Sequence, residues 1–262
     1  MKARRLLVVA LAAAILAGAA TVAMSEVIRV GDLVVTVNGG FKPKKLHKRK
    51  WTPIELSANV NLRADRDNPF EDLPIVDRLV IDFDRNGTLD TRGLPRCQVH
   101  KLINTTTPKA RKKCRKAMVA KGRTEAWLQF EDQAPIKAWG KLSAFNGKHN
   151  GKRVIIFHVF AHEPLRTAFV VPAPITNAPG KRWGKRVRID IPPIAGGNGT
   201  LTDAKIRVKR RWRHRGKRRS YLLARCPTGR LSAKGLGWLR DRETGETTEV
   251  MGSVTRRCRG VR

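Results

Sequence analysis

The sequence has few aromatic and few acidic residues. Aromatic residues make up only 6% of the chain, and 21 acidic residues are set against 55 lysines and arginines. The shortage of rings argues against the stacking platforms that bind single-stranded nucleic acid or sugars. The formal net charge of +34 argues against cationic ligands and favours anionic ones, such as nucleic acid, anionic lipid or an acidic cell-wall polymer.

Signatures of catalysis are also missing. The chain contains no G-x-S-x-G nucleophile turn, Walker loop or dinucleotide-binding fingerprint, so no cofactor is predicted. A non-enzymatic protein is therefore favoured. Acidic pairs such as Glu71-Asp72 and Glu131-Asp132 keep an extracellular hydrolase with a dispersed site as an alternative, because sequence spacing does not fix the distance between carboxylates.

Two segments resemble metal-binding motifs only in part. His158 and His162 lie in a β-branched and aromatic run, so we expect strand residues roughly 13 Å apart that cannot share one metal ion. The segment Asp82 to Asp90 reproduces the start of a calcium loop, but Gly93 stands where a bidentate carboxylate should close the site. We interpret the segment as a hairpin that turns at Asn86-Gly87 with solvated acids, and weak calcium binding is the alternative.

Residues 1–25 predict an export signal. Lys2, Arg4 and Arg5 precede an uncharged run rich in Leu, Val and Ala, and small residues at Ala23 and Ser25 permit cleavage. An uncleaved membrane anchor is the alternative, and it is the one way in which a membrane partner is expected. The predicted localisation is secreted or associated with the cell envelope.

Four cysteines agree with export. Cys97, Cys114, Cys226 and Cys258 form two sequence-local pairs and lack the C-x-x-C spacing of zinc sites. An even number of cysteines is typical of an oxidising compartment. We expect the disulfides Cys97–Cys114 and Cys226–Cys258, because each pairing closes the shorter available loop.

The remaining pattern is typical of antiparallel strands. Ile54 to Arg63 and Arg186 to Ile191 alternate between apolar and polar residues, and Ile75 to Phe83 carries a third apolar face. Asn-Gly dipeptides suit tight hairpin turns and occur five times, at Asn38-Gly39, Asn86-Gly87, Asn146-Gly147, Asn150-Gly151 and Asn198-Gly199. We predict an all-β protein with an antiparallel β-sandwich.

One segment and one boundary interrupt this pattern. Thr107 to Gly122 predicts a short surface helix near residues 108–120, with Pro108 in its first turn. Residues 26–262 are predicted to form a single sandwich domain. A proline-bearing stretch near residues 170–180 is the candidate subdomain boundary.

Several short motifs together resemble a known group of proteins. They are Gly93 to Cys97, then Thr107, Ala110 and Cys114, then Ala144 to Gly147, then Arg215 to Leu222, and then Cys226-Pro227. The set resembles uncharacterised exported proteins of high-GC Gram-positive bacteria. The resemblance implies export, a cysteine-stapled β-rich fold and a bacterial envelope or extracellular setting. It implies no activity and no functional residue.

Basic clusters are the strongest surface feature. The segment from Lys205 to Arg215 is predicted to be one strand with six outward cations, followed by a turn over Arg215 to Arg219 and a return strand over Ser220 to Cys226. We call these six residues the cationic row: Lys205, Arg207, Lys209, Arg211, Arg213 and Arg215. They are expected to bind an anionic polymer or surface with low specificity, and no specific nucleic acid is predicted. A merely solvated face, as in a structural envelope protein with no ligand, is the alternative.

Overall fold

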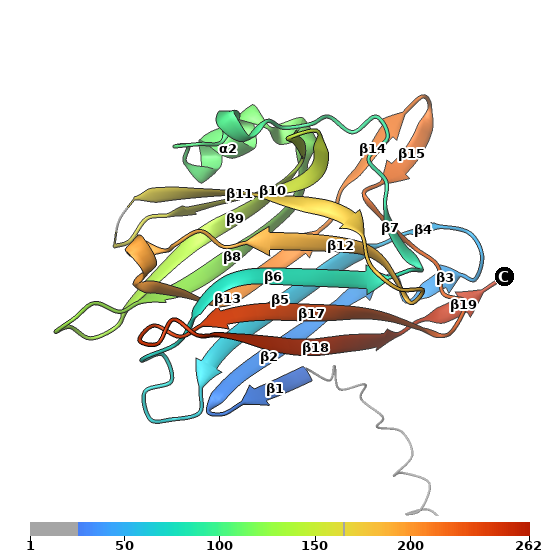
Figure 1. Cartoon of the computed structure of the whole chain (residues 1–262). Helices are drawn as coiled ribbons and strands as arrows, with labels where there is room; N and C mark the ends of the chain where they lie inside the picture. The colour runs from blue at the N-terminus through green and yellow to red at the C-terminus, as the bar shows by residue number, and fades with distance from the viewer. Residues whose placement is uncertain (1–25, 165) are drawn as a thin grey trace, which may run out of the picture.

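The computed structural model describes residues 26–164 and 166–262, so the predicted export signal lies outside the described residues. Most of the regular structure in the described residues consists of antiparallel strands (Figure 1). The predicted all-β antiparallel class is confirmed.

A 12-stranded sheet forms the body of the protein. In spatial order its strands are β1 (Glu26–Val30), β2 (Leu33–Lys42), β5 (Glu55–Ala64), β13 (Gly199–Val208), β8 (Met118–Leu128), β9 (Ile136–His149), β10 (Lys152–Ala161), β11 (Thr167–Asn177), β12 (Trp183–Asp190), β6 (Ile75–Asp84), β17 (Arg230–Arg240) and β18 (Thr247–Arg257). Because β11 pairs with both β10 and β12, the sheet continues across the stretch at residues 170–180.

Smaller elements decorate this sheet. They are the pairs β14 (Arg211–His214) with β15 (Lys217–Ser220) and β3 (Lys45–His47) with β19 (Arg259–Val261), the three-stranded set β4 (Thr52–Pro53), β16 (Leu222–Ala224) and β7 (Gly87–Leu89), the helix α2 (Thr107–Lys113), and the 3-10 turns η1 (Val99–Lys101), η2 (Arg115–Ala117) and η3 (Ala195–Gly197). The hairpin β14–β15 projects from one end of the molecule (Figure 1).

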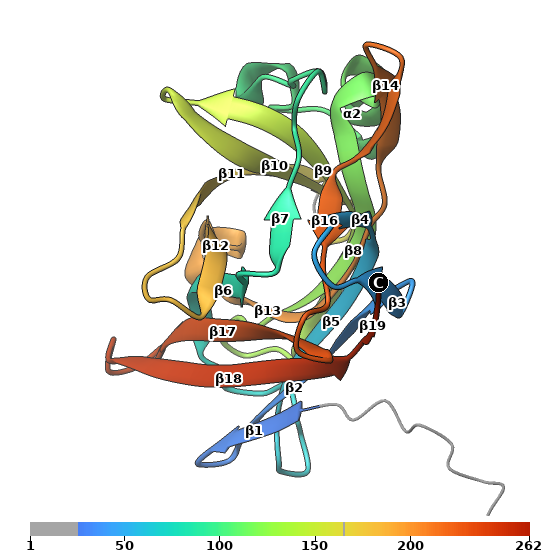
Figure 2. The ribbon, with the colours of Figure 1, turned by 90° about the vertical axis from the view of Figure 1, so that its right-hand side faces the viewer.

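The large sheet curls until its two edges lie side by side. Strands β1 and β18 meet below the body in both views (Figures 1 and 2), and the backbone N–H of Ser253 donates a hydrogen bond of 3.2 Å to Glu26. Leu62, Val76 and Leu239 pack together across the facing halves and exclude water. This arrangement gives the two facing layers expected of a sandwich.

The predicted helix forms but is shorter than expected. Helix α2 ends at Lys113, and Gly122 lies inside β8 rather than at a helix end. A Cβ at Gly122 would lie only 2.0 Å from the carbonyl oxygen of Lys205 on β13. The glycine therefore serves a close approach of two strands, which sequence alone cannot distinguish from a helix stop.

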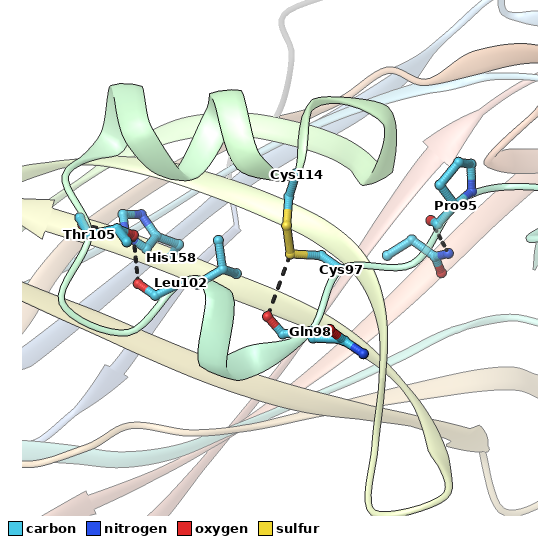
Figure 3. Close-up of a disulfide and its surroundings, with 8 residues drawn as sticks. Pro95, Cys97, Gln98, Leu102, Thr105, Cys114 and His158 are labelled. Carbon is cyan, nitrogen blue, oxygen red and sulfur yellow. Dashed lines mark hydrogen bonds between the residues drawn. A yellow bond between two sulfur atoms is a disulfide. The ribbon is translucent and has the colours of Figure 1, made fainter.

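The first predicted disulfide fixes this helical segment to the sheet. Cys97 and Cys114 are bonded with a Cα–Cα distance of 5.6 Å and lie in a core with Phe145 and Ile156 (Figure 3). Beside them, the buried His158 donates a hydrogen bond of 2.8 Å from Nε2 to the carbonyl oxygen of Thr105. The helix thus covers the outward face of β9 and β10.

The second predicted disulfide closes the other end of the chain. Cys226 and Cys258 are bonded with a Cα–Cα distance of 6.2 Å and pack with Leu46 and Ile54. Both predicted pairings are confirmed. Disulfides of this kind are typical of proteins that fold in an oxidising compartment.

Only one of the five Asn-Gly dipeptides is a two-residue hairpin turn. Asn150-Gly151 joins β9 to β10 with positive φ angles of 46° and 74°. Asn38-Gly39 and Asn146-Gly147 lie inside strands, and Asn198-Gly199 leads from a 3-10 turn into β13. At Asn86-Gly87 the chain does turn, but β6 and β7 pair with other strands, so the expected hairpin is wrong there.

Candidate polyanion-binding surface

The predicted single strand is in fact two strands. Strand β13 ends at Val208, β14 begins at Arg211, and Arg215 lies in the turn, so the prediction of one continuous strand is wrong. The turn is also tighter than predicted: Arg215-Gly216 adopts positive φ angles of 49° and 72°, and the return strand begins at Lys217. The sequence signal for this turn was the single glycine among cations.

The alternation of side chains nevertheless survives the break. All six members of the cationic row are exposed, whereas Ile206, Val208 and Trp212 are half-buried against a core that includes Tyr221. Arg210 points with the apolar set and donates a hydrogen bond of 2.9 Å to the carbonyl oxygen of Lys116. The six cations therefore all face solvent along β13, β14 and the turn that follows.

One carboxylate bridges the two halves of the row. Glu55 lies 2.9 Å from Arg207, 3.0 Å from Lys209 and 3.9 Å from Arg211, measured between oxygen and nitrogen atoms. Hydrogen bonds from Lys209 and Arg207 hold the pKa of Glu55 below its usual range. Within residues 26–164 and 166–262, no carboxylate forms a salt bridge with Lys205, Arg213 or Arg215, so the row carries a large uncompensated charge.

The inner face of the β14–β15 hairpin anchors it to the body. Trp212 donates a hydrogen bond of 3.1 Å from its indole N–H to the carbonyl oxygen of Arg92. Arg219, directly opposite Trp212, donates one of 2.8 Å to the buried Asp90. Hydrogen bonds from Arg92 and Arg219 keep the pKa of Asp90 below its usual range despite burial. The outer arginines are thus held on an ordered support.

Neighbouring strands widen the basic surface beyond what the sequence revealed. Arg207 lies opposite Lys121 on β8, and Lys205 lies opposite Arg123, which in turn lies opposite Lys141 on β9. Directly opposed residues of antiparallel strands share one face, and all five side chains are exposed. Sequence reasoning missed the three additional cations because β8 and β9 come to lie beside β13 only in the folded sheet.

The acids of this face form a separate line. Asp203 lies opposite Glu125 in the next row of the same sheet. Lys137 donates to Glu125 at 2.8 Å and holds the pKa of that carboxyl below its usual range. Burial raises the pKa of Asp203 above its usual range. Arg123 lies 3.8 Å from Glu125, and Lys205 is close enough to influence the pKa of both carboxyl groups. These acids therefore offset part of the positive charge at this end of the surface.

Two acids of the predicted calcium loop pair with arginine side chains. Asp82 is buried and accepts two hydrogen bonds, of 2.6 and 2.8 Å, from Arg186 on the neighbouring strand. The expectation of solvated acids is therefore wrong for Asp82 and for Asp90. Asp84 accepts hydrogen bonds from Asn86 and stabilises the turn. Among the described residues, no cluster of three potential metal ligands occurs.

The two candidate histidines lie in different environments. His158 is fully buried in β10 beneath the helical segment, and burial lowers its pKa. His162 follows the end of β10 and contacts the rings of Phe160 and Trp139. Each histidine therefore makes structural contacts of its own.

Two recesses open on the described part of the molecule. A small one of 230 Å³ is lined by Leu89, Thr91, Arg153, Ile175, Thr176, Asn177 and Lys185. A larger one of 580 Å³ lies beside the β14–β15 hairpin and is lined by Pro43, Pro53, Arg211, Trp212, Arg213, Arg218 and Arg219. Neither is lined by a carboxylate. No helix in the described ranges is long and apolar enough to cross a membrane.

Comparison with known proteins finds no matching family model, no matching curated sequence and no matching solved structure.

Proposed function

We propose that this chain is an exported, non-enzymatic protein of the cell envelope that binds anionic polymers or surfaces through the cationic row. The observation that supports this most is the exposure of all six cations with one bridging acid, Glu55. Mutual repulsion along such a row is relieved when an extended polyanion lies on it.

The spacing supports an extended partner. Residues two apart along a strand lie roughly 6.6 Å from each other, so Lys205 and Arg207 on β13, and Arg211 and Arg213 on β14, present charges at this interval. Lys121, Arg123 and Lys141 extend the same surface sideways over β8 and β9. A ligand that is itself a chain of anions can meet several of these charges at once, which favours avidity over a specific single contact.

A hydrolase fits the surface less well. The candidate pair Asp203 and Glu125 has pKa shifts in opposite directions, as catalytic carboxylates often do. The pair lines neither recess, and catalysis favours a site that surrounds its substrate. Binding is therefore the function that the geometry supports best.

Retention on immobilised polymers tests the proposal. We expect the parent protein to be retained by a teichoic-acid-like polymer, by anionic vesicles and by DNA at low salt, and to elute as salt rises, because released counterions drive such binding. The variant Arg207→Gln/Arg211→Gln/Arg213→Gln should elute at clearly lower salt.

A matched variant controls for net charge alone. Arg230→Gln/Arg257→Gln/Arg259→Gln removes three exposed charges from β17, β18 and β19 and should elute close to the parent. If the parent is not retained, or if both triple variants shift equally, the cationic row is only a solvated face and the proposal fails.

A further inference from the structure

The larger recess is a groove whose charged lining is entirely arginine. Arg211, Arg213, Arg218 and Arg219 supply that charge, with Trp212, Pro43 and Pro53 completing the lining. Elsewhere the cationic row mixes lysine with arginine. A guanidinium presents a planar fork of N–H donors that matches oxyanions, whereas a lysine ammonium acts as a point charge. An all-arginine groove therefore indicates directed hydrogen bonding rather than general attraction.

The hairpin register brings two of these arginines together. Arg213 on β14 lies directly opposite Arg218 on β15, and both side chains are exposed. Like charges directly opposite each other destabilise a strand pair. No carboxylate in the described part of the chain forms a salt bridge with either one. An anion placed between the two guanidinium groups would relieve this repulsion.

The support of the groove is already ordered. The inner face of the hairpin is held by the bond from Trp212 to Arg92 and by the bond from Arg219 to Asp90. The tight turn at Arg215-Gly216 fixes the register of the two strands. Binding would therefore cost only the ordering of the outer side chains, which favours affinity.

We propose that this groove is a phosphate-selective subsite, in which Arg213 and Arg218 together bind one phosphate group of a phosphate-bearing polyol or sugar. The free oxygen atoms of a phosphate are arranged around a tetrahedral centre, so they can accept from two guanidinium groups that approach from different sides, whereas the two oxygen atoms of a carboxylate lie in one plane. The groove volume of 580 Å³ exceeds that of a bare anion and lies within the range of small-molecule sites. Trp212, Pro43 and Pro53 provide apolar surface for the carbon skeleton.

This inference rests on the proposed function, because it specifies the anionic group that one end of the cationic row binds. Its test uses two matched double variants, Arg213→Gln/Arg218→Gln in the groove and Arg230→Gln/Arg257→Gln outside it. Arg230 and Arg257 are also directly opposed arginines, on β17 and β18. Each variant removes two exposed charges. Circular dichroism of both checks that the fold is kept.

Titration with glycerol 3-phosphate, followed by NMR of the arginine Nε–Hε groups, gives the readout. We expect the parent to bind this probe more tightly than malonate, a dicarboxylate of similar charge. The groove variant should lose about tenfold in affinity, and the variant outside the groove should change little. Soluble glycerol-phosphate polymer and phosphatidylglycerol vesicles then distinguish the two sources of the group, and a larger loss in the groove variant with either carrier supports the inference.

Equal losses in both variants, or equal affinity for malonate, would overturn the phosphate-selective subsite. Polymer retention by the parent without any binding of glycerol 3-phosphate would overturn the subsite and leave the proposed function standing. Absence of polymer retention in the parent would overturn the proposed function itself.

Discussion

Single residues decide how much positive charge this surface offers to a ligand. Glu55 contacts Arg207 and Lys209 and lies 3.9 Å from Arg211, so it competes with any polyanion for these cations. Its lowered pKa keeps it ionised at neutral pH. Asp203 lies on the same sheet face, and burial raises its pKa. Glu55 limits binding most directly, because it is the acid that contacts the row itself.

Replacement of this acid should strengthen binding. We expect Glu55→Gln to raise the affinity for anionic polymer by about twofold, the scale of one exposed ion pair. Glu249→Gln, at an exposed position on β18, changes the net charge equally and should have little effect. Direct binding titrations at fixed salt give the comparison, and an unchanged or weakened Glu55→Gln would contradict the competition.

His158 gives the fold a dependence on pH. Burial lowers its pKa below the ordinary value of 6.5, so the unfolded chain binds a proton more readily than the folded one. The free energy of unfolding should thus be highest above that ordinary value and should fall as the pH drops below it. His158→Gln keeps a donor for the carbonyl of Thr105. This variant should reduce the dependence of the free energy of unfolding on pH.

Urea unfolding at neutral and mildly acidic pH measures the effect. His100→Gln alters an exposed histidine and should leave the slope as in the parent. A parent whose stability does not change over this range would show that His158 is not responsible for any pH dependence.

At the scale of elements, close approach between strands matters more than local propensity. Gly122 on β8 faces the backbone of Lys205 on β13, beneath the cationic row. We expect Gly122→Ala to destabilise the fold by about 1–3 kcal/mol, because the backbone must move to admit the methyl group. Gly235→Ala on β17 is the matched control, since a Cβ there meets nothing within 4 Å. Chemical denaturation gives the free energy of unfolding of both variants, and equal values would contradict the tight contact at Gly122.

The helical segment depends on its own crosslink. The Cys97–Cys114 bond closes a loop of 17 residues, and its loss in Cys97→Ala/Cys114→Ala should cost about 3 kcal/mol on the chain-entropy estimate. Trypsin should then cleave more rapidly at Lys109 to Lys116. Loss of the Cys226–Cys258 bond should leave that cleavage slow, and increased cleavage there in both variants would contradict a local role for the first disulfide.

Much of the element pattern could be predicted from sequence, and its failures have physical causes. The strand at β5 and the two cysteine pairs are local signals, and both predictions are confirmed, although most side chains of β5 are partly buried rather than alternately buried and exposed. The Asn-Gly turns were overpredicted because a glycine inside a strand, such as Gly147 against Ile156, serves close packing instead. Lys121 and Arg123 joined the candidate site only through strand pairing, which a local pattern does not contain.

At the scale of the whole molecule, basic residues greatly outnumber acidic ones, and the acids offset the positive charge in some places more than in others. The net charge of +34 is reduced locally where acids are paired, as at Asp82 with Arg186 and Asp77 with Arg240. The curled sheet fixes the faces, so β13, β8 and β9 present their cations together. A uniformly basic chain would bind polyanions through any surface, whereas this arrangement predicts one preferred face.

The salt dependence of binding to a polyanion of known charge spacing tests that prediction most directly. For duplex DNA, the logarithm of the affinity falls with the logarithm of salt concentration by about 0.9 for each phosphate neutralised. We predict that Arg207→Gln/Arg211→Gln/Arg213→Gln reduces this slope by about 2 to 3, whereas Arg230→Gln/Arg257→Gln/Arg259→Gln leaves it near that of the parent. Equal slopes for all three proteins would contradict the claim that the cationic row is the binding surface.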